Sequence, residues 1–164
     1  DEAIIMLQDL LKIKPDYLQA TQLLGDILYE EERFKEAISI YITALKYHPT
    51  EYSLYYDIGM AFTRLNDFQR AKEYYGKAAE LNTIVYNTKY SLAEIAVIYK
   101  ELEEAEQYFL QATEDEELCA DAYLELANLH NYIKIDCVKD GIIRTKEDIN
   151  NEVYQKVKEK IMEN

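Results

Sequence analysis

The sequence predicts an all-α chain of stacked helical hairpins, an α-α solenoid, on three observations. Alanines at positions 3, 37, 71 and 105 follow one another at intervals of 34 residues. Two further registers of small residues keep the same interval: Gly25, Gly59, Ala93 and Ala127, and Ala44, Ala78 and Ala112. The 164 residues include only four Gly and two Pro, as expected for a nearly all-helical chain. A fixed period of this length is typical of a helical hairpin that stacks on copies of itself.

The small registers locate the seams between paired helices, because two helices approach closely only where the side chains between them are small. We place the Gly25 register on the first helix of each hairpin, and the Ala37 and Ala44 registers on the second. The expected helices span residues 2–12, 17–30, 34–47, 52–65, 68–81, 86–99, 102–113 and 119–132. The corresponding repeats are 17–50, 51–84 and 85–118, preceded at 1–16 by the second helix of a truncated repeat.

The C-terminal part is expected to hold a degenerate repeat and a capping helix over residues 119–164. Residues 133–147 break the period. A last helix is expected near 147–162, because Ile149, Val153, Val157 and Ile161 form one apolar stripe at helical spacing. Its polar outer face would shield the end of the stack, as terminal caps of solenoids do.

The best copy of the repeat contains Leu24, Gly25, Ala37, Tyr41, Ala44 and Pro49. Most of these positions recur in the next two copies, as in Ile58-Gly59 with Tyr75 and in Leu92-Ala93 with Phe109. Over residues 1–132 the chain resembles the tetratricopeptide repeat family. The resemblance implies a protein-interaction scaffold whose first helices line a concave groove.

The candidate partner-binding residues lie on the first helices, on the sides that point away from the second helices. They are Gln22, Asp26, Tyr29, Tyr56, Met60, Arg64, Tyr90, Glu94 and Asn128. Tyrosines offer rigid apolar faces with a hydroxyl, and amides pair with a peptide backbone. Such a surface suits an extended peptide or a partner helix. The alternative is that these are ordinary solvated positions without a ligand.

Two groove types known in the family do not match this chain. Members that grip a C-terminal carboxylate use lysines, an arginine and asparagines, and the matching positions here are Gln22, Asp26, Asp57, Asn87 and Ser91. Sugar-transferase relatives carry a ladder of asparagines, and the equivalent positions are Leu23, Asp57, Ser91 and Glu125. We therefore expect neither function.

The net charge of −14 argues against nucleic acid, since a phosphate binder needs a basic stripe, and equally against anionic membrane surfaces. The sequence contains no run of 18 apolar residues, so it predicts no membrane span. Acids concentrate between Glu101 and Glu117, as a solvated outer face or as a docking patch for a basic partner. The expected partner is a protein or peptide, with a basic one as an option, and the oligomeric state stays open.

The chain is not expected to be an enzyme or to bind a cofactor. It has two histidines, His48 and His130, no nucleophile–base–acid set on one surface, and no glycine-rich phosphate loop. The alternatives left open are an accessory domain of a larger enzyme and a structural spacer. Cys119 and Cys137 are expected to be unpaired thiols in a reducing cytosol, which favours a cytoplasmic protein.

One segment, Asp136 to Glu147, partly follows the calcium-loop template. Asp136, Asp140, Gly141 and Glu147 fall at the first, fifth, sixth and twelfth positions, but Val138 offers no ligand at the third. The same segment also fits a plain turn or a short hairpin, because Asp-Gly is a common turn pair. We favour the turn or hairpin and predict no metal.

Overall fold

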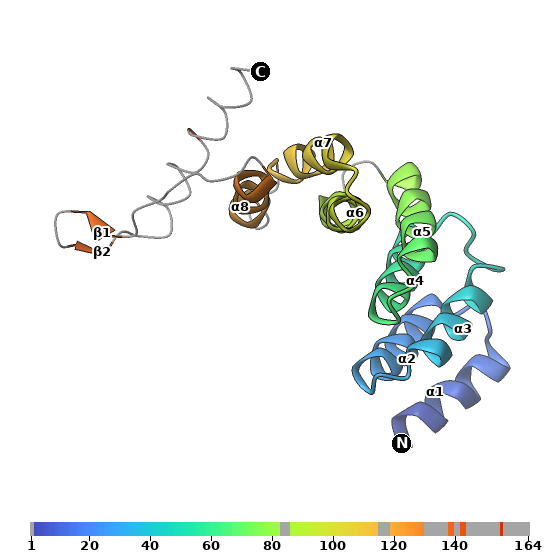
Figure 1. The fold of residues 1–164 in the computed structure, drawn as a ribbon. Helices are drawn as coiled ribbons and strands as arrows, with labels where there is room; N and C mark the ends of the chain where they lie inside the picture. The colour runs from blue at the N-terminus through green and yellow to red at the C-terminus, as the bar shows by residue number, and fades with distance from the viewer. Residues whose placement is uncertain are drawn as a thin grey trace. The chain divides into compact units, whose positions relative to one another are not determined.

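The computed structural model describes residues 2–82, 86–114, 119–129, 138–139, 142–143 and 155. The chain forms two compact units, Asp1–Thr88 and Lys89–Asn164, and each is described by itself. The helices that the structure describes are α1 (Glu2–Ile13), α2 (Leu18–Glu30), α3 (Phe34–Ala44), α4 (Tyr52–Arg64), α5 (Phe68–Leu81), α6 (Tyr86–Tyr99), α7 (Leu102–Ala112) and α8 (Cys119–Leu129) (Figure 1). These elements confirm the predicted all-α solenoid. None of the described helices is both long and apolar enough to cross a membrane.

In the first unit, each of the helices α1 to α5 packs against the next one along the chain (Figure 1). The predicted small registers lie at these seams: Ala37, Ala71 and Ala78 are fully buried, and Ala44 is nearly so. Larger apolar side chains such as Leu24 fill the space between them. The burial confirms that small residues set the distance between paired helices.

The glycine register is explained by an aromatic ring from the second helix. A Cβ built on Gly25 would lie 2.2 Å from Cε1 of Tyr41, and one on Gly59 would lie 2.6 Å from Cδ1 of Tyr75. Both tyrosines are buried, with 1% and 2% of their surface exposed. The tyrosine ring occupies the place of a Cβ atom, so each of these positions requires glycine.

The turn after each first helix repeats the same backbone conformation. Glu32, Asn66 and Lys100 have positive φ angles of 58°, 57° and 61°, and they are spaced by the repeat length. In each turn the following residue donates its N–H back to the helix, as Arg33 does to the Leu28 carbonyl at 2.8 Å. This left-handed closure is usually made by glycine, so three non-glycine residues here carry backbone strain.

In the second unit, α6, α7 and α8 enclose an alanine-rich core. Its buried members are Ala93, Ala96, Ala105, Phe109, Ala112, Ala122 and Leu126. Here the small residue of the first helix is alanine instead of glycine, and the ring of the second helix is Phe109 instead of tyrosine. The second unit thus repeats the pairing of a small residue with a ring: the small residue gains a methyl group, and the ring loses its hydroxyl.

The helix bounds agree with the sequence within a few residues. The helix expected at 34–47 ends at Ala44, because the chain turns there with the Tyr47 N–H bound to the Ala44 carbonyl at 2.9 Å, ahead of Pro49. The capping helix expected near 147–162 lies outside the described residues, except for position 155. The repeat boundaries stay predictions.

The calcium-loop segment contains a short antiparallel hairpin. Strands β1 (Val138–Lys139) and β2 (Ile142–Ile143) pair with Val138 opposite Ile143, which supports the hairpin interpretation. The acids Asp136, Asp140 and Glu147 lie outside the described residues. Within the described part of the chain, no group of three His, Cys, Asp or Glu side chains is placed to hold a metal ion.

Candidate functional site

Six of the predicted partner-binding residues belong to the first unit, on α2 and α4. We call the surface they define the α2–α4 face: Gln22, Asp26, Tyr29, Tyr56, Met60 and Arg64. Within each helix they recur at intervals of three or four residues, which places them on one side of that helix. We describe their contacts from the start of the helices to their ends.

A chain of hydrogen bonds connects α2 to the start of α4. Gln22 donates from Nε2 to Oγ of Ser53 at 2.9 Å, and Ser53 donates from Oγ to Oε1 of Glu51 at 2.8 Å. The Glu51 carboxylate also caps α4 by accepting the Ser53 N–H at 3.4 Å. Gln22 is therefore held by the neighbouring repeat, in an orientation fixed before any ligand binds.

Three carboxylates on α2 and in the first part of α4 lie near one another, and we call Asp26, Glu51 and Asp57 the acidic cluster. The hydroxyl of Tyr41 donates to Oδ1 of Asp26 at 3.1 Å. Partial burial, followed by repulsion from Asp26 and Glu51, raises the pKa of Asp57 to about 7. Burial, Asp57 and Asp26 also raise the pKa of Tyr41, so its hydroxyl stays a donor. The acidic cluster therefore opposes ionisation of its half-buried member, Asp57.

Tyr29 of α2 and Tyr56 of α4 each contact an aromatic ring of a second helix. The Tyr29 and Phe34 rings meet edge to face with centroids 5.2 Å apart. The guanidinium carbon of Arg64 lies 5.2 Å from the Phe34 centroid and 5.8 Å from the Tyr29 centroid. Tyr56 packs against Tyr75 of α5 at 5.5 Å, which leaves it half-buried. These rings form a rigid surface whose orientation is set by the second helices.

The remaining three candidates lie in the second unit. Tyr90 packs edge to face against Phe109 at 5.3 Å, and burial together with nearby acids, Glu94 first, raises its pKa to about 12. Burial and Glu125 raise the pKa of Glu94. Asn128 donates from Nδ2 to Oε2 of Glu125 at 3.5 Å. Tyr90, Glu94 and Asn128 thus all interact with the Glu125 carboxylate on α8.

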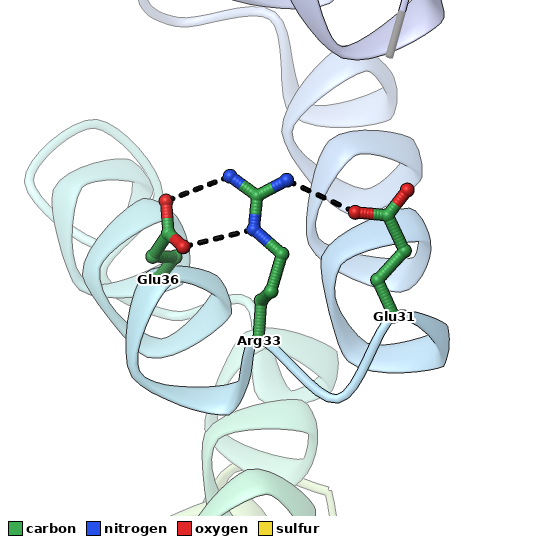
Figure 2. A network of polar contacts seen from close by, with 3 residues as sticks. All are labelled: Glu31, Arg33 and Glu36. Carbon is green, nitrogen blue, oxygen red and sulfur yellow. Dashed lines mark hydrogen bonds and ion pairs between the residues drawn. The ribbon is translucent and has the colours of Figure 1, made fainter.

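Figure 2 shows a polar network that holds the turn between α2 and α3. Arg33 donates to both oxygens of Glu36, at 2.8 and 2.9 Å, and to Glu31 at 2.9 Å. The pKa of Glu36 is lowered because the guanidinium favours its charged form. Both carboxylates that pair with Arg33 lie beside the same turn, so the network stabilises that turn.

The histidine in the described part of the chain is also structural. His48 lies at the turn that ends one repeat, and its Nε2 is 2.7 Å from the Asp16 carbonyl at the preceding repeat turn. The contact links two successive turns of the solenoid. His130 lies outside the described residues.

The sequence analysis missed part of this site. Asp57 enters the sequence analysis only as a mismatch to known grooves, Ser53 shares the side of the helix that carries Tyr56 without being among the selected residues, and Glu51 is not identified from the sequence. A usable signal existed: Tyr41 follows Gly25 by 16 residues, as Tyr75 follows Gly59, and a ring that reaches across the seam brings its hydroxyl toward the first helix.

The tetratricopeptide repeat family model matches residues 23–83 and 56–116, which together make up more than half of the chain. The chain belongs to the tetratricopeptide repeat family. The repeats seen in the structure agree with this assignment, since helical hairpins recur with the matched period. A search of curated protein sequences gave no significant match.

Several solved structures share the fold of this tetratricopeptide chain. A MamA protein gives a TM-score of 0.72 at 18% identity over 98% of this chain and 79% of its own. MamA 41-end from Desulfovibrio magneticus RS-1 gives 0.61 at 20% identity, and the match covers 68% of this chain and 63% of that one. The chain thus spans less than two thirds of that relative.

Two further neighbours were solved with peptides. The first tetratricopeptide domain of Spaghetti (RPAP3), bound to an HSP90 peptide, gives a TM-score of 0.64 at 21% identity over 68% of this chain and 89% of its own. The Yersinia enterocolitica type III secretion chaperone SycD, in complex with a peptide of the translocator YopD, gives 0.66 at 17% identity over 70% and 93%. At these identities the likeness establishes the fold.

Proposed function

We propose that the chain is a non-catalytic interaction scaffold that binds an extended peptide or partner helix on the first-helix surface of a unit: the α2–α4 face in the first unit, or the surface with Tyr90, Glu94 and Asn128 in the second. One observation carries the proposal. On α2, Gln22 donates a hydrogen bond to Ser53 of α4, and Asp26 accepts one from Tyr41 of α3. Side chains fixed in this way lose little entropy when a ligand binds, which favours recognition.

The chemistry of the face favours a ligand with at least one basic group. Asp57 has a pKa raised to about 7 because burial and two further carboxylates oppose its charge. A lysine or arginine side chain placed beside the acidic cluster would relieve this repulsion and restore full ionisation of Asp57. The net charge of −14 would also draw such a partner in and disfavour nucleic acid and anionic membranes.

The comparisons support this proposal at the level of the family. Two structural neighbours carry peptides according to their names, and the present chain shares their fold. We propose a cytoplasmic location on the weaker basis of two cysteines expected to be unpaired thiols.

The experiment that tests the scaffold uses peptides selected from a random library against the purified chain. Calorimetry then compares the parent with a variant that combines Tyr56→Ala and Tyr90→Ala. Truncated hot-spot tyrosines commonly cost about 2 kcal/mol, so we expect affinity to fall roughly thirtyfold. Helicity by circular dichroism should not change.

Tyr47→Ala is the matched control, because Tyr47 is 48% exposed and follows the end of α3. It should bind as the parent does. If no peptide is enriched, the scaffold proposal fails. If peptides bind but ignore both tyrosines and map instead to Glu101–Glu117, the site lies on the acidic segment and the α2–α4 face is refuted.

A further inference from the structure

Arg64 differs from the two other arginines in the described part of the chain. Arg33 pairs with Glu31 and Glu36, and Arg70 pairs with Asp67. Arg64 forms no ion pair or hydrogen bond within the described residues, and its contacts there are the Tyr29 and Phe34 rings. An arginine that avoids carboxylates in a chain with 32 acidic residues is unusual on charge grounds alone.

The two rings leave the hydrogen-bonding groups of Arg64 available. An aromatic ring attracts the charge of a guanidinium without neutralising it as a carboxylate would. The residue is exposed, so a ligand can reach it. The planar fork of donors in a guanidinium matches the two oxygens of a carboxylate.

We propose that Arg64, supported by the Tyr29 and Phe34 rings, binds a carboxylate side chain of the peptide that occupies the α2–α4 face. The inference rests on the proposed function and names the ligand chemistry at one position of it. The surrounding charge favours a carboxylate over a phosphate, because a doubly charged group would be repelled more strongly by a chain of net charge −14.

The acidic cluster supplies a second constraint on the ligand. Asp57 and Arg64 are both on α4, seven residues apart, which corresponds to about 10 Å along the helix axis and nearly the same side. A peptide in the polyproline II conformation turns once in three residues and rises about 3.1 Å per residue, so its residues i and i+3 lie about 9 Å apart on one side. The preferred ligand therefore carries a basic and an acidic residue separated by two others.

The test selects random dodecapeptides against four purified proteins: the parent chain, Arg64→Gln, Arg64→Glu and Arg70→Gln. The parent should enrich peptides with Asp or Glu at one fixed position. Arg70→Gln should do the same, because Arg70 lies on α5 and forms an ion pair with Asp67. Arg64→Gln should lose that preference. Arg64→Glu should replace it with Lys or Arg at the same position.

Calorimetry on one enriched peptide then compares Glu, Gln and phosphoserine at that position. For an exposed ion pair we expect Glu→Gln to weaken binding to the parent roughly three- to tenfold and to have no effect on Arg64→Gln. Arg64→Lys keeps the charge without the planar fork and should give an intermediate affinity. Circular dichroism verifies that each variant is folded.

Each outcome decides the inference. Enriched peptides without an acidic position, or an acidic preference that survives in Arg64→Gln, would overturn it while leaving the scaffold standing. Phosphoserine that binds more tightly than Glu would overturn the carboxylate assignment. Selection of no peptide by any protein would remove the scaffold proposal and this inference with it.

Discussion

Replacement of Asp57 by asparagine should stabilise the fold, and the gain should depend on pH. Asp57 is half-buried and repelled by Asp26 and Glu51, which raises its pKa from 3.8 to about 7. A carboxyl whose folded pKa is raised binds its proton more tightly in the folded state than in the unfolded one. The stabilisation that this tighter proton binding gives to the folded state is therefore complete below pH 4 and is lost as the pH rises through 7.

The size of the effect follows from the same shift. Three pKa units correspond to about 4 kcal/mol between the protonated and ionised forms, which sets the upper limit. Relaxation of a half-buried group reduces this limit, so we expect Asp57→Asn to gain about 2 kcal/mol in the free energy of unfolding at pH 8. At pH 5 the carboxyl is protonated in the folded protein but already ionised in the unfolded one, so about a third of this gain should remain, and the two proteins should differ little only near pH 4.

Urea unfolding followed by helical circular dichroism at pH 5, 6, 7 and 8 measures this difference. Glu80→Gln removes an equal charge from an exposed position on α5 and should stay within about 0.5 kcal/mol of the parent at every pH. A gain for Asp57→Asn that does not grow with pH, or a loss at pH 8, would refute the electrostatic explanation of the raised Asp57 pKa. The same variant should weaken binding of basic peptides.

Other substitutions test the packing and the turns. Gly25→Ala should destabilise by roughly 1–3 kcal/mol, since the new Cβ would lie 2.2 Å from a buried ring, and an unchanged melting temperature would contradict the seam assignment. Lys100→Gly, at φ 61°, should gain up to about 1 kcal/mol in urea unfolding, whereas a loss would mean that the side chain is needed there. The Thr88 hydroxyl is buried without a hydrogen-bond partner in the part of the chain that the structure describes. Thr88→Val should therefore be neutral or stabilising by about 1 kcal/mol in thermal unfolding, and a clear destabilisation would reveal a partner.

The fold was accessible from the sequence because periodic information is redundant. Each seam is marked several times at the same interval, as Ala37 and Ala71 illustrate, so local ambiguity at one repeat is corrected by the others. Helix ends were predicted less well, since they depend on single turns such as the one after Ala44.

The candidate site was only partly accessible, for a physical reason. The positions of Gln22 and Asp26 follow from the helical period, but their orientation depends on partners from other helices, Ser53 and Tyr41. The raised pKa of Asp57 likewise depends on burial and on distances between three carboxylates. Periodicity fixes the face on which a residue lies and carries no information on what it contacts there.

The contact between a small residue on the first helix and a ring on the second has a consequence for evolution. Gly25 with Tyr41, Gly59 with Tyr75, and Ala93 with Phe109 are each separated by 16 positions. Because an added carbon needs the ring to move, a change at one position restricts the other. Among descendants of this chain, a substitution at one position of a pair should therefore be accompanied by a compensating substitution at the other.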